Sequence, residues 1–299
     1  MPIARWVLPG VIAAGALSLH ESAASSRGTA IDTIELPPRA FVYRQAGEFS
    51  LAGRPVNAPQ ATITRSQPLR IMTRQVSAAE YQRCAAAGAC RPNGSEPSRD
   101  LPAVNVSFED ATSYARWLSE ETGVSWRLPT DEEWAFAAGS RFHDDALPVA
   151  ASDDPSRRWL ARYEREASGA SFGRQPRRVG AFGANEFGVV DLSGNVWEWT
   201  NTCFSRRSLD RGDGSRAVVN CGVRVVEGQH RAYVTDFIRD ASAGGCAAGT
   251  PPSNLGFRLV RDDATLAARL AARLCAYMAS HWQGCDARAA DETAWSGGF

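Results

Sequence analysis

The segment Phe187–Thr202, which reads FGVVDLSGNVWEWTNT, joins oxygen-bearing side chains to a glycine turn and two tryptophans. Asp191 and Glu198 lie on either side of Gly194, so the chain can curl until both carboxylates face one point. A buried carboxylate is costly unless it is paired or binds a metal, and calcium prefers a mixture of carboxylate and carbonyl oxygens. The segment therefore predicts a structural calcium ion. The alternative is that the two carboxylates accept hydrogen bonds from nearby backbone N–H groups.

Two histidines form a second candidate for chemistry. His230 lies near Tyr233 and an acid, and such a group can do general acid–base work near neutral pH. The alternative is that His230 only forms a hydrogen bond within a polar loop. His143 and Asp145, with His230 downstream, also give the outline of a two-histidine, one-carboxylate iron site. The spacing alone is weak support for iron.

The seven cysteines suit an oxidising compartment, and their odd number leaves at least one unpaired within the chain. Cys84 and Cys90 are six residues apart with Gly88 between them, so a chain reversal would bring them within bonding range. Cys275 and Cys285 can pair only if the helix expected around them ends early. No CxxC pair is present, which argues against a thioredoxin-type or zinc site.

The elements that must position these residues are short. Segments 40–44, 61–65 and 69–76 are β-like, and capping boxes beginning at Ser77, Ser107 and Thr130 predict three helices, the second ending at Gly123. Residues 139–186 are expected to form loops with some helix around 157–166. Segments 221–228 and 255–261 are β-like again, and 262–282 has the pattern of an amphipathic helix.

Composition excludes several classes of function. The 299 residues contain 33 basic and 33 acidic side chains, so no net charge draws the chain to nucleic acid or to an anionic membrane. Every basic residue is arginine, which excludes Schiff-base and P-loop lysine chemistry. The hydrophobic content of 44% is sufficient for a sizeable core.

The N-terminus predicts export. Arg5 precedes an apolar run of residues 6–19, and the small residues 22–24 suit cleavage, so residues 1–24 are expected to be a signal peptide and 25–34 a linker. The run is too short to span a bilayer comfortably. We therefore expect a periplasmic or secreted protein with no stable membrane span after cleavage.

Three motifs carry a resemblance to a known family. PAVNVSFEDATSYARWLSEETGVSWRLPTDEEWAFAA, NEFGVVDLSGNVWEWT and NLGFRLVR occur in the order seen in the formylglycine-generating enzyme, or sulfatase-modifying factor, family. The resemblance, which extends to the periplasmic siderophore-maturation members, implies an α+β variant of the C-type lectin fold with little regular secondary structure. It covers a domain at 35–261, and a C-terminal helix and tail at 262–299 lie outside it.

The resemblance also implies roles for particular residues. The calcium ligands would be the carboxylates of Asp191 and Glu198 and the backbone carbonyls of Gly194 and Val196. A pocket would contain three hypothetical catalytic residues. The indole of Trp197 would form one wall, and His230 and Tyr233 would supply an imidazole and a phenol. The same groove would be lined by three substrate-binding residues: Arg231, Asp236 and Arg239.

The main departure from the family concerns copper. The two cysteines that hold copper(I) in formylglycine-generating enzymes fall here at about Tyr233 and Ile238, and neither side chain is a thiolate. Two functions follow. The first is an exported oxidoreductase that modifies a protein or peptide-derived substrate with an unknown redox metal. The second is a calcium-stabilised module that binds a ligand or protein without chemistry. The sequence gives neither the substrate nor the oligomeric state.

Overall fold

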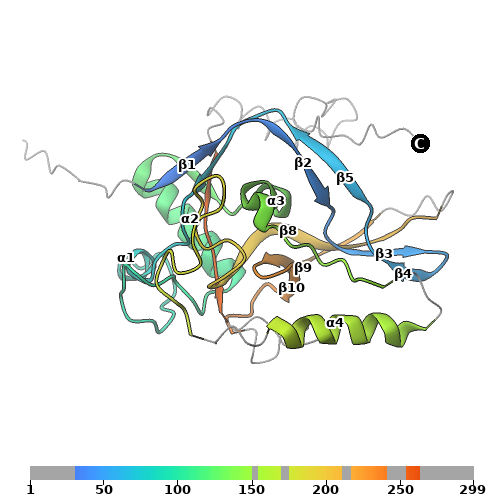
Figure 1. Cartoon of the computed structure of the whole chain (residues 1–299). Coiled ribbons are helices and arrows are strands. Elements are labelled where there is room, and N and C mark those ends of the chain that lie inside the picture. Colours follow the sequence, from blue (N-terminus) through green and yellow to red (C-terminus); the bar gives the residue numbers. More distant parts are fainter. Residues whose placement is uncertain (1–30, 150–153, 170–174, 211–216, 241–253, 263–299) are drawn as a thin grey trace, which may run out of the picture. The chain divides into compact units, whose positions relative to one another are not determined.

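The computed structural model describes residues 31–149, 154–169, 175–210, 217–240 and 254–262 (Figure 1). All of them belong to one compact unit, Ile31–Phe299. The predicted signal peptide and nearly all of the predicted C-terminal helix and tail lie outside the described residues. Within them, no helix combines the length and the apolar character that a membrane span requires.

The three predicted capping boxes are confirmed. Ser77, Ser107 and Thr130 are the N-caps of α1 (Ala78–Ala86), α2 (Phe108–Thr122) and α3 (Asp131–Ala138), and each cap exchanges hydrogen bonds with the acidic residue three positions later. The second helix ends at Gly123, as predicted, where φ is 67° and a residue without Cβ is favoured. A fourth helix, α4 (Pro155–Gly169), extends the helix expected around 157–166 at both ends.

The strands form three small sheets. The four-stranded sheet has the order β1 (Thr33–Leu36), β6 (Leu69–Met72), β12 (Val260–Asp262) and β7 (Ser125–Arg127). A two-stranded ribbon joins β2 (Arg39–Arg44) to β5 (Gln60–Arg65). The six-stranded sheet has the order β10 (Ala232–Thr235), β9 (Val218–Glu227), β8 (Trp197–Ser208), β3 (Glu48–Leu51) and β4 (Arg54–Val56), and β11 (Leu255–Gly256) also pairs with β8.

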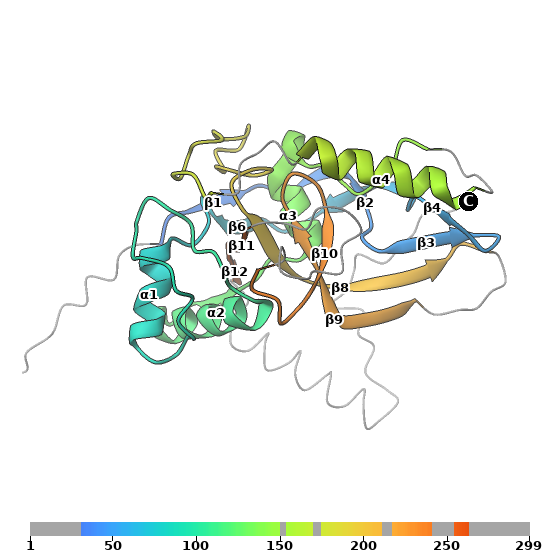
Figure 2. The ribbon, with the colours of Figure 1, turned by 90° about the horizontal axis from the view of Figure 1, so that it is seen from below.

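The long strand β8 organises the six-stranded sheet. It is antiparallel to β9 and parallel to β3 and β11, and Figure 2 shows β8 and β9 side by side below β3. Trp199 anchors the start of this strand because its ring is fully buried and its Nε1 donates to the Val106 carbonyl at 2.8 Å. The tryptophan-rich motif is thus the beginning of a strand as well as the end of a turn.

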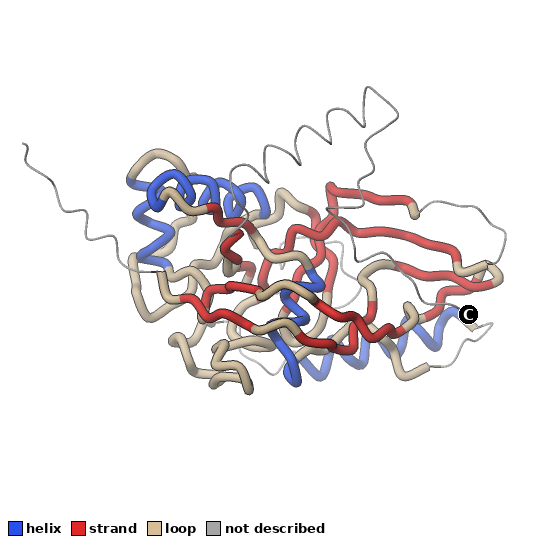
Figure 3. The backbone as a smooth tube through the Cα atoms, turned by 90° about the horizontal axis from the view of Figure 1, so that it is seen from above, coloured by secondary structure: helices blue, strands red, loops and turns tan. Residues whose placement is uncertain are grey.

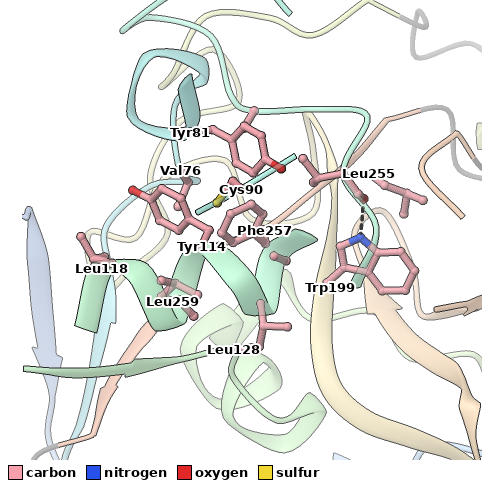
Figure 4. Packing of buried hydrophobic residues seen from close by; sticks show 14 of the residues in the cluster. Val76, Tyr81, Cys90, Tyr114, Leu118, Leu128, Trp199, Leu255, Phe257 and Leu259 are labelled. Atoms are coloured by element: carbon pink, nitrogen blue, oxygen red, sulfur yellow. Dashed lines mark hydrogen bonds between the residues drawn. The ribbon is translucent and has the colours of Figure 1, made fainter. Parts of the chain in front are cut away.

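Aromatic side chains fill the main core. Tyr114 packs against Tyr81 and Phe257, with ring centroids 6.1 Å and 5.3 Å away, and all three rings are fully buried (Figure 4). These rings come from α1, α2 and the segment before β12. Such pairs add to the free energy gained from burial alone, so the core fixes the C-terminal strands against the first two helices.

The α+β class is confirmed, with long loops between short strands and few helices (Figure 3). One boundary differs from the prediction. β1 begins at Thr33, inside the expected linker 25–34, because Thr33 and Ile34 pair with Met72 and Ile71 of β6. The first strand therefore begins two residues before the expected domain start at Glu35.

Two disulfides connect the described cysteines. Cys84 bonds to Cys90, as the spacing predicts, and Cys203 of β8 bonds to Cys221 of β9, a pair that the sequence did not indicate. Cys246, Cys275 and Cys285 lie outside the described residues.

Candidate functional site

The carboxylate of Glu198 lies buried within a complete set of donors. Its Oε1 accepts from Arg258 Nη2 and Gln75 Nε2, both at 2.7 Å. Its Oε2 accepts from Arg258 Nε at 2.6 Å and from Trp134 Nε1 at 2.9 Å. A carboxylate offers about four acceptor positions, so all of them are used by the chain itself.

Arg258 reaches Glu198 because β11 pairs in parallel with the first residues of β8. In this register Gly256 lies opposite Glu198, and Arg258 follows two residues later. The side chain of Arg258 is fully buried, and its Nη2 also donates to the Val190 carbonyl at 3.0 Å. The GFR and WEW motifs are therefore the two halves of one bidentate, buried ion pair.

The turn before β8 is held by the carboxylate of Asp191. Its two oxygens accept from the backbone N–H groups of Gly180 at 2.6 Å and Phe182 at 2.9 Å. Asp191, Ser193 and Asn195 all have positive φ, between 58° and 65°. Such conformations are uncommon for residues other than glycine, and the hydrogen bonds to the 180–182 segment hold the turn in place.

Three of the four predicted calcium ligands take part in hydrogen bonds of the chain itself. Glu198 already neutralises Arg258, and a cation on the same oxygens would have to displace a guanidinium and an indole. Asp191 accepts backbone hydrogen bonds, which was the alternative reading of this segment. The Gly194 carbonyl accepts from the N–H of Val196 at 2.8 Å. Calcium at this turn stays a prediction.

Trp197 and His230 lie in contact, edge to face, with ring centroids 4.8 Å apart. His230 is 7% exposed, and its Nδ1 is 2.8 Å from the carbonyl oxygen of Arg231. A carbonyl can only accept, so Nδ1 is the donor in this contact. Gly228 makes this contact possible, because a Cβ there would lie 2.9 Å from the Trp197 ring.

Arg231 lies fully buried among carboxylates of the chain. It donates to Asp131 at 2.9 Å and 3.1 Å, to Glu227 at 2.9 Å and to Asp145 at 3.2 Å. The phenol of Tyr43 donates to Asp131 as well. These acids already bind the guanidinium. Arg231 is therefore not exposed to contact a substrate, as its predicted role would require.

Glu227 is the unusual member of this buried group. Burial raises the pKa of Glu227 well above its ordinary value, and the charge of the neighbouring Asp131 raises it further. No donor among the described residues reaches Glu227 Oε2. A proton on this oxygen would satisfy it by donating to Asp131, and burial and the Asp131 charge both favour the protonated form.

Tyr233, the predicted catalytic phenol, is also part of this buried group. Its hydroxyl donates to Asp145 and accepts from the Gly47 N–H at 2.8 Å. Burial raises the pKa of Tyr233 well above its ordinary value, and the charge of Asp145 adds to the shift. The phenol thus keeps its proton and joins β10 to the loop before β3.

The last two predicted groove residues lie in other contacts. Arg239 forms a bidentate pair with Asp110 of α2, at 2.7 Å and 2.8 Å. Asp236 joins the same region through its backbone, because its carbonyl accepts from the N–H of Phe108 at 3.0 Å. Of the six predicted residues, the structure brings Trp197 and His230 together and places Arg231 and Tyr233 in the buried charge network. Arg239 and Asp236 lie toward the start of α2.

Two residues of the possible iron site, His143 and Asp145, contact the buried charge network around Arg231. Asp145 is bonded to Arg231 and Tyr233, and the carbonyl of His143 accepts from the Arg231 N–H at 3.1 Å. Among the residues that the structure describes, no three histidine, cysteine or acidic side chains are grouped to hold a metal ion.

A cleft of about 380 Å³ lies along β8, beyond the tryptophan motif. Its volume is in the range of small-ligand sites. The lining brings Glu132 and Arg207, of opposite charge, together with Tyr43, Cys203 and hydroxyl side chains. Val219, which is 60% exposed, adds an apolar surface. The cleft could not be predicted from the sequence, because its residues come from four separate segments; only the helix start at Thr130 pointed to it.

Comparison with known proteins supplies the family context. Residues 23–263 match the family described as the sulfatase-modifying factor enzyme 1-like domain. The inactive C-alpha-formylglycine-generating enzyme 2 of Mus musculus is 31% identical over 182 residues, which are 56% of this chain and 51% of that protein. The formylglycine-generating enzyme of Mycobacterium tuberculosis is 37% identical over 113 residues, 34% of each chain.

A solved structure, PvdO from Pseudomonas aeruginosa, covers 77% of this chain and 94% of its own, with 23% identity and a TM-score of 0.48. The chain spans about half the length of the Mus musculus relative and about a third of the Mycobacterium tuberculosis one. The family match confirms the predicted fold, and the relatives include proteins named as formylglycine-generating enzymes and one named as inactive.

Proposed function

This chain belongs to the sulfatase-modifying factor enzyme 1-like family, and we propose that it is an exported binding protein. Its ligand would be a peptide segment of a partner protein, held in the cleft along β8. One observation carries the proposal. Three of the groups that the sequence offered in the family groove, Arg231, Tyr233 and Arg239, are bonded to carboxylates of the chain itself, whereas the β8 cleft presents polar, charged and apolar side chains together.

The cleft has the features that a peptide needs. Glu132 and Arg207 can pair with charged side chains of either sign, and the hydroxyls of Thr202 and Ser205 can exchange hydrogen bonds with a main chain. Val219, which is 60% exposed, and Ala217 add apolar atoms to this lining. Such apolar residues on a polar surface suit a protein ligand better than a small polar one.

The absence of copper oxidation is part of the proposal. The position where the family resemblance expects a copper thiolate holds Tyr233, whose hydroxyl is bonded to Asp145 and Gly47. A phenol with a raised pKa does not replace a soft thiolate as a copper(I) ligand. Export is supported by the apolar N-terminus and by two disulfides, which persist in oxidising compartments.

A second candidate is the oxidoreductase. It is favoured by the contact between His230 and Trp197, because a nearly buried imidazole with a fixed Nδ1 proton beside an indole is a suitable acid–base group. In that case His230→Ala would remove turnover of a cysteinyl peptide under O₂, while peptide affinity stayed unchanged. The binding-protein proposal predicts no such turnover with or without the substitution.

Selection of peptides on the full chain tests the main proposal. Peptides recovered from a random displayed library should bind in solution with micromolar affinity and lose about tenfold with Arg207→Ala, since a charge pair with this partly buried side chain would contribute about 1.4 kcal/mol. Arg206→Ala is the matched control, because Arg206 is on the same strand but is 67% exposed and pairs with Glu48. Equal losses in both variants, or none, would rule out the cleft as the binding site.

A further inference from the structure

The disulfide between β8 and β9 has surroundings that differ from those of the other described disulfide. Cys203 lines the β8 cleft and Cys221 is exposed, whereas Cys84 and Cys90 are 0% and 5% exposed within the main core. A disulfide that solvent reaches can be attacked by an external thiolate, and a buried one cannot. The two bonds should therefore differ in reactivity.

A cation lies directly on one sulfur of the β8–β9 disulfide. Arg224 is opposite Cys203 in the strand register, and its Nη1 donates to Cys203 Sγ at 3.1 Å. The same Nη1 is 3.2 Å from the Asn201 carbonyl, and the guanidinium lies over the Phe108 ring at 4.0 Å. These contacts fix the positive charge beside the sulfur.

The charge of Asp236 acts on Arg224, but among the described residues no carboxylate forms an ion pair with this guanidinium. Its Nε is buried and has no hydrogen-bond partner among the described residues. A positive charge next to a sulfur stabilises the thiolate. Cys203 is therefore the better leaving group of the pair, and Cys221, which faces solvent, is the sulfur open to attack.

We propose that Cys203–Cys221 is a thiol–disulfide exchange site for a dithiol at the protein surface, such as a partner with two accessible cysteines. A substrate thiolate attacks Cys221 Sγ, the bond between the two protein sulfurs breaks, and its electron pair leaves with Cys203 as a thiolate beside Arg224. The second substrate thiolate then attacks the substrate sulfur in the mixed disulfide and releases Cys221. Two electrons pass from the substrate, which becomes a disulfide, to the protein.

This chemistry needs only a small thiol, so it can be tested apart from peptide binding in the cleft. The full oxidised chain is treated with dithiothreitol, samples are alkylated over time, and peptide mass spectrometry follows each cysteine. Cys203 and Cys221 should become alkylated at least about tenfold faster than Cys84 and Cys90. Equal rates for the two disulfides would overturn the proposal.

Variants test the part played by the cation. Arg224→Gln should slow reduction of Cys203–Cys221 about threefold or more, and Arg224→Lys should restore part of the rate, because leaving-group thiols of lower pKa leave faster. Arg206→Gln is the control, since Arg206 is on the strand of Cys203 and pairs with Glu48. Identical rates for Arg224→Gln and Arg206→Gln would overturn the assignment of Cys203 as leaving group.

A measurement on the unmodified protein guards against misfolded variants. After brief exposure to glutathione and acid quenching, the mixed disulfide should be found on Cys221, with Cys203 as the free thiol. A mixed disulfide found mainly on Cys203 would contradict the proposed direction of attack.

Discussion

Arg258 and Glu198 form a bidentate ion pair in which both side chains are almost completely shielded from solvent, 0% and 1% exposed. The pair joins the start of β8 to the chain just before β12, sixty residues later. Gln75 and Trp134 complete the carboxylate's hydrogen bonds from two other elements. A single side chain thereby connects four segments of the fold, which explains why a glutamate stands between two tryptophans.

Removing one partner of this ion pair should strongly lower the stability of the folded protein. Glu198→Gln leaves the Arg258 charge buried without compensation, and the free energy of unfolding should fall by about 3–5 kcal/mol. Urea denaturation at pH 7 measures it. Glu35→Gln is the control, because Glu35 pairs with Arg70 but is 51% exposed; it should change stability by less than about 1 kcal/mol. A loss from Glu198→Gln as small as that of the control would contradict the buried-pair account.

Replacing both partners should cost less than replacing one. The double variant Glu198→Leu with Arg258→Met removes both charges together, so it should recover at least half of the stability lost in either single variant. A double variant as unstable as the sum of the single ones would show that the two residues act independently.

Calcium removal distinguishes the two interpretations of the turn before β8, which are a calcium site and a set of hydrogen bonds within the chain. Because the oxygens of Glu198 are used by Arg258, Gln75 and Trp134, dialysis against EGTA should leave the melting temperature unchanged within about 1 °C. Metal analysis of the same sample provides the control. One calcium per chain, together with a large drop in melting temperature on chelation, would instead support the calcium site predicted from the sequence.

The raised pKa of Glu227 makes a pH-dependent prediction. The folded state holds this proton more tightly than the unfolded state, whose value is near 4.5. The stabilisation is fully present below that value and is lost as pH rises through the folded pKa. Between the two pKa values wild-type stability should decline relative to Glu227→Gln, which cannot titrate, by about 1.4 kcal/mol per pH unit.

Urea unfolding at several pH values between 4 and 9 tests this. Glu109→Gln, at a carboxylate that is 78% exposed, is the control and should show no such trend against the wild type. A constant difference between wild type and Glu227→Gln at every pH would mean that Glu227 is ionised in the folded protein.

Tyr233→Phe distinguishes a structural phenol from a catalytic one. The substitution leaves the Gly47 N–H and the Asp145 carboxylate without their shared partner, so stability should fall by about 1–3 kcal/mol. Tyr163→Phe, at an exposed position on α4, should have almost no effect. An unchanged stability in Tyr233→Phe, with loss of a turnover present in wild type, would favour the oxidoreductase.

Local signals in the sequence predicted the local structure well. The capping boxes at Ser77, Ser107 and Thr130 and the Cys84–Cys90 bond depend on residues within a few positions of one another. The partner of Glu198 was not predictable in this way. It is chosen by the parallel register of β11 on β8, and no short-range spacing reports that register.

Contacts between distant segments also explain the other features that the sequence did not predict. Strand β8 mixes polar and apolar residues without regular alternation, because it has a bulge near Cys203 and changes neighbours along its length. Its disulfide and its cleft therefore could not be read from the residues alone. The family resemblance indicated a groove near residues 230–239, but it could not show that Arg231 and Arg239 are bonded to acids of the chain itself.

The most direct test of the proposed function is hydrogen exchange of the full chain with and without a selected peptide. Binding in the β8 cleft predicts new protection in residues 43–46 and 202–207, and an unchanged pattern in residues 228–239. Protection confined to 228–239, around His230 and beside Trp197, would contradict the cleft and return the function to the groove that the sequence first suggested.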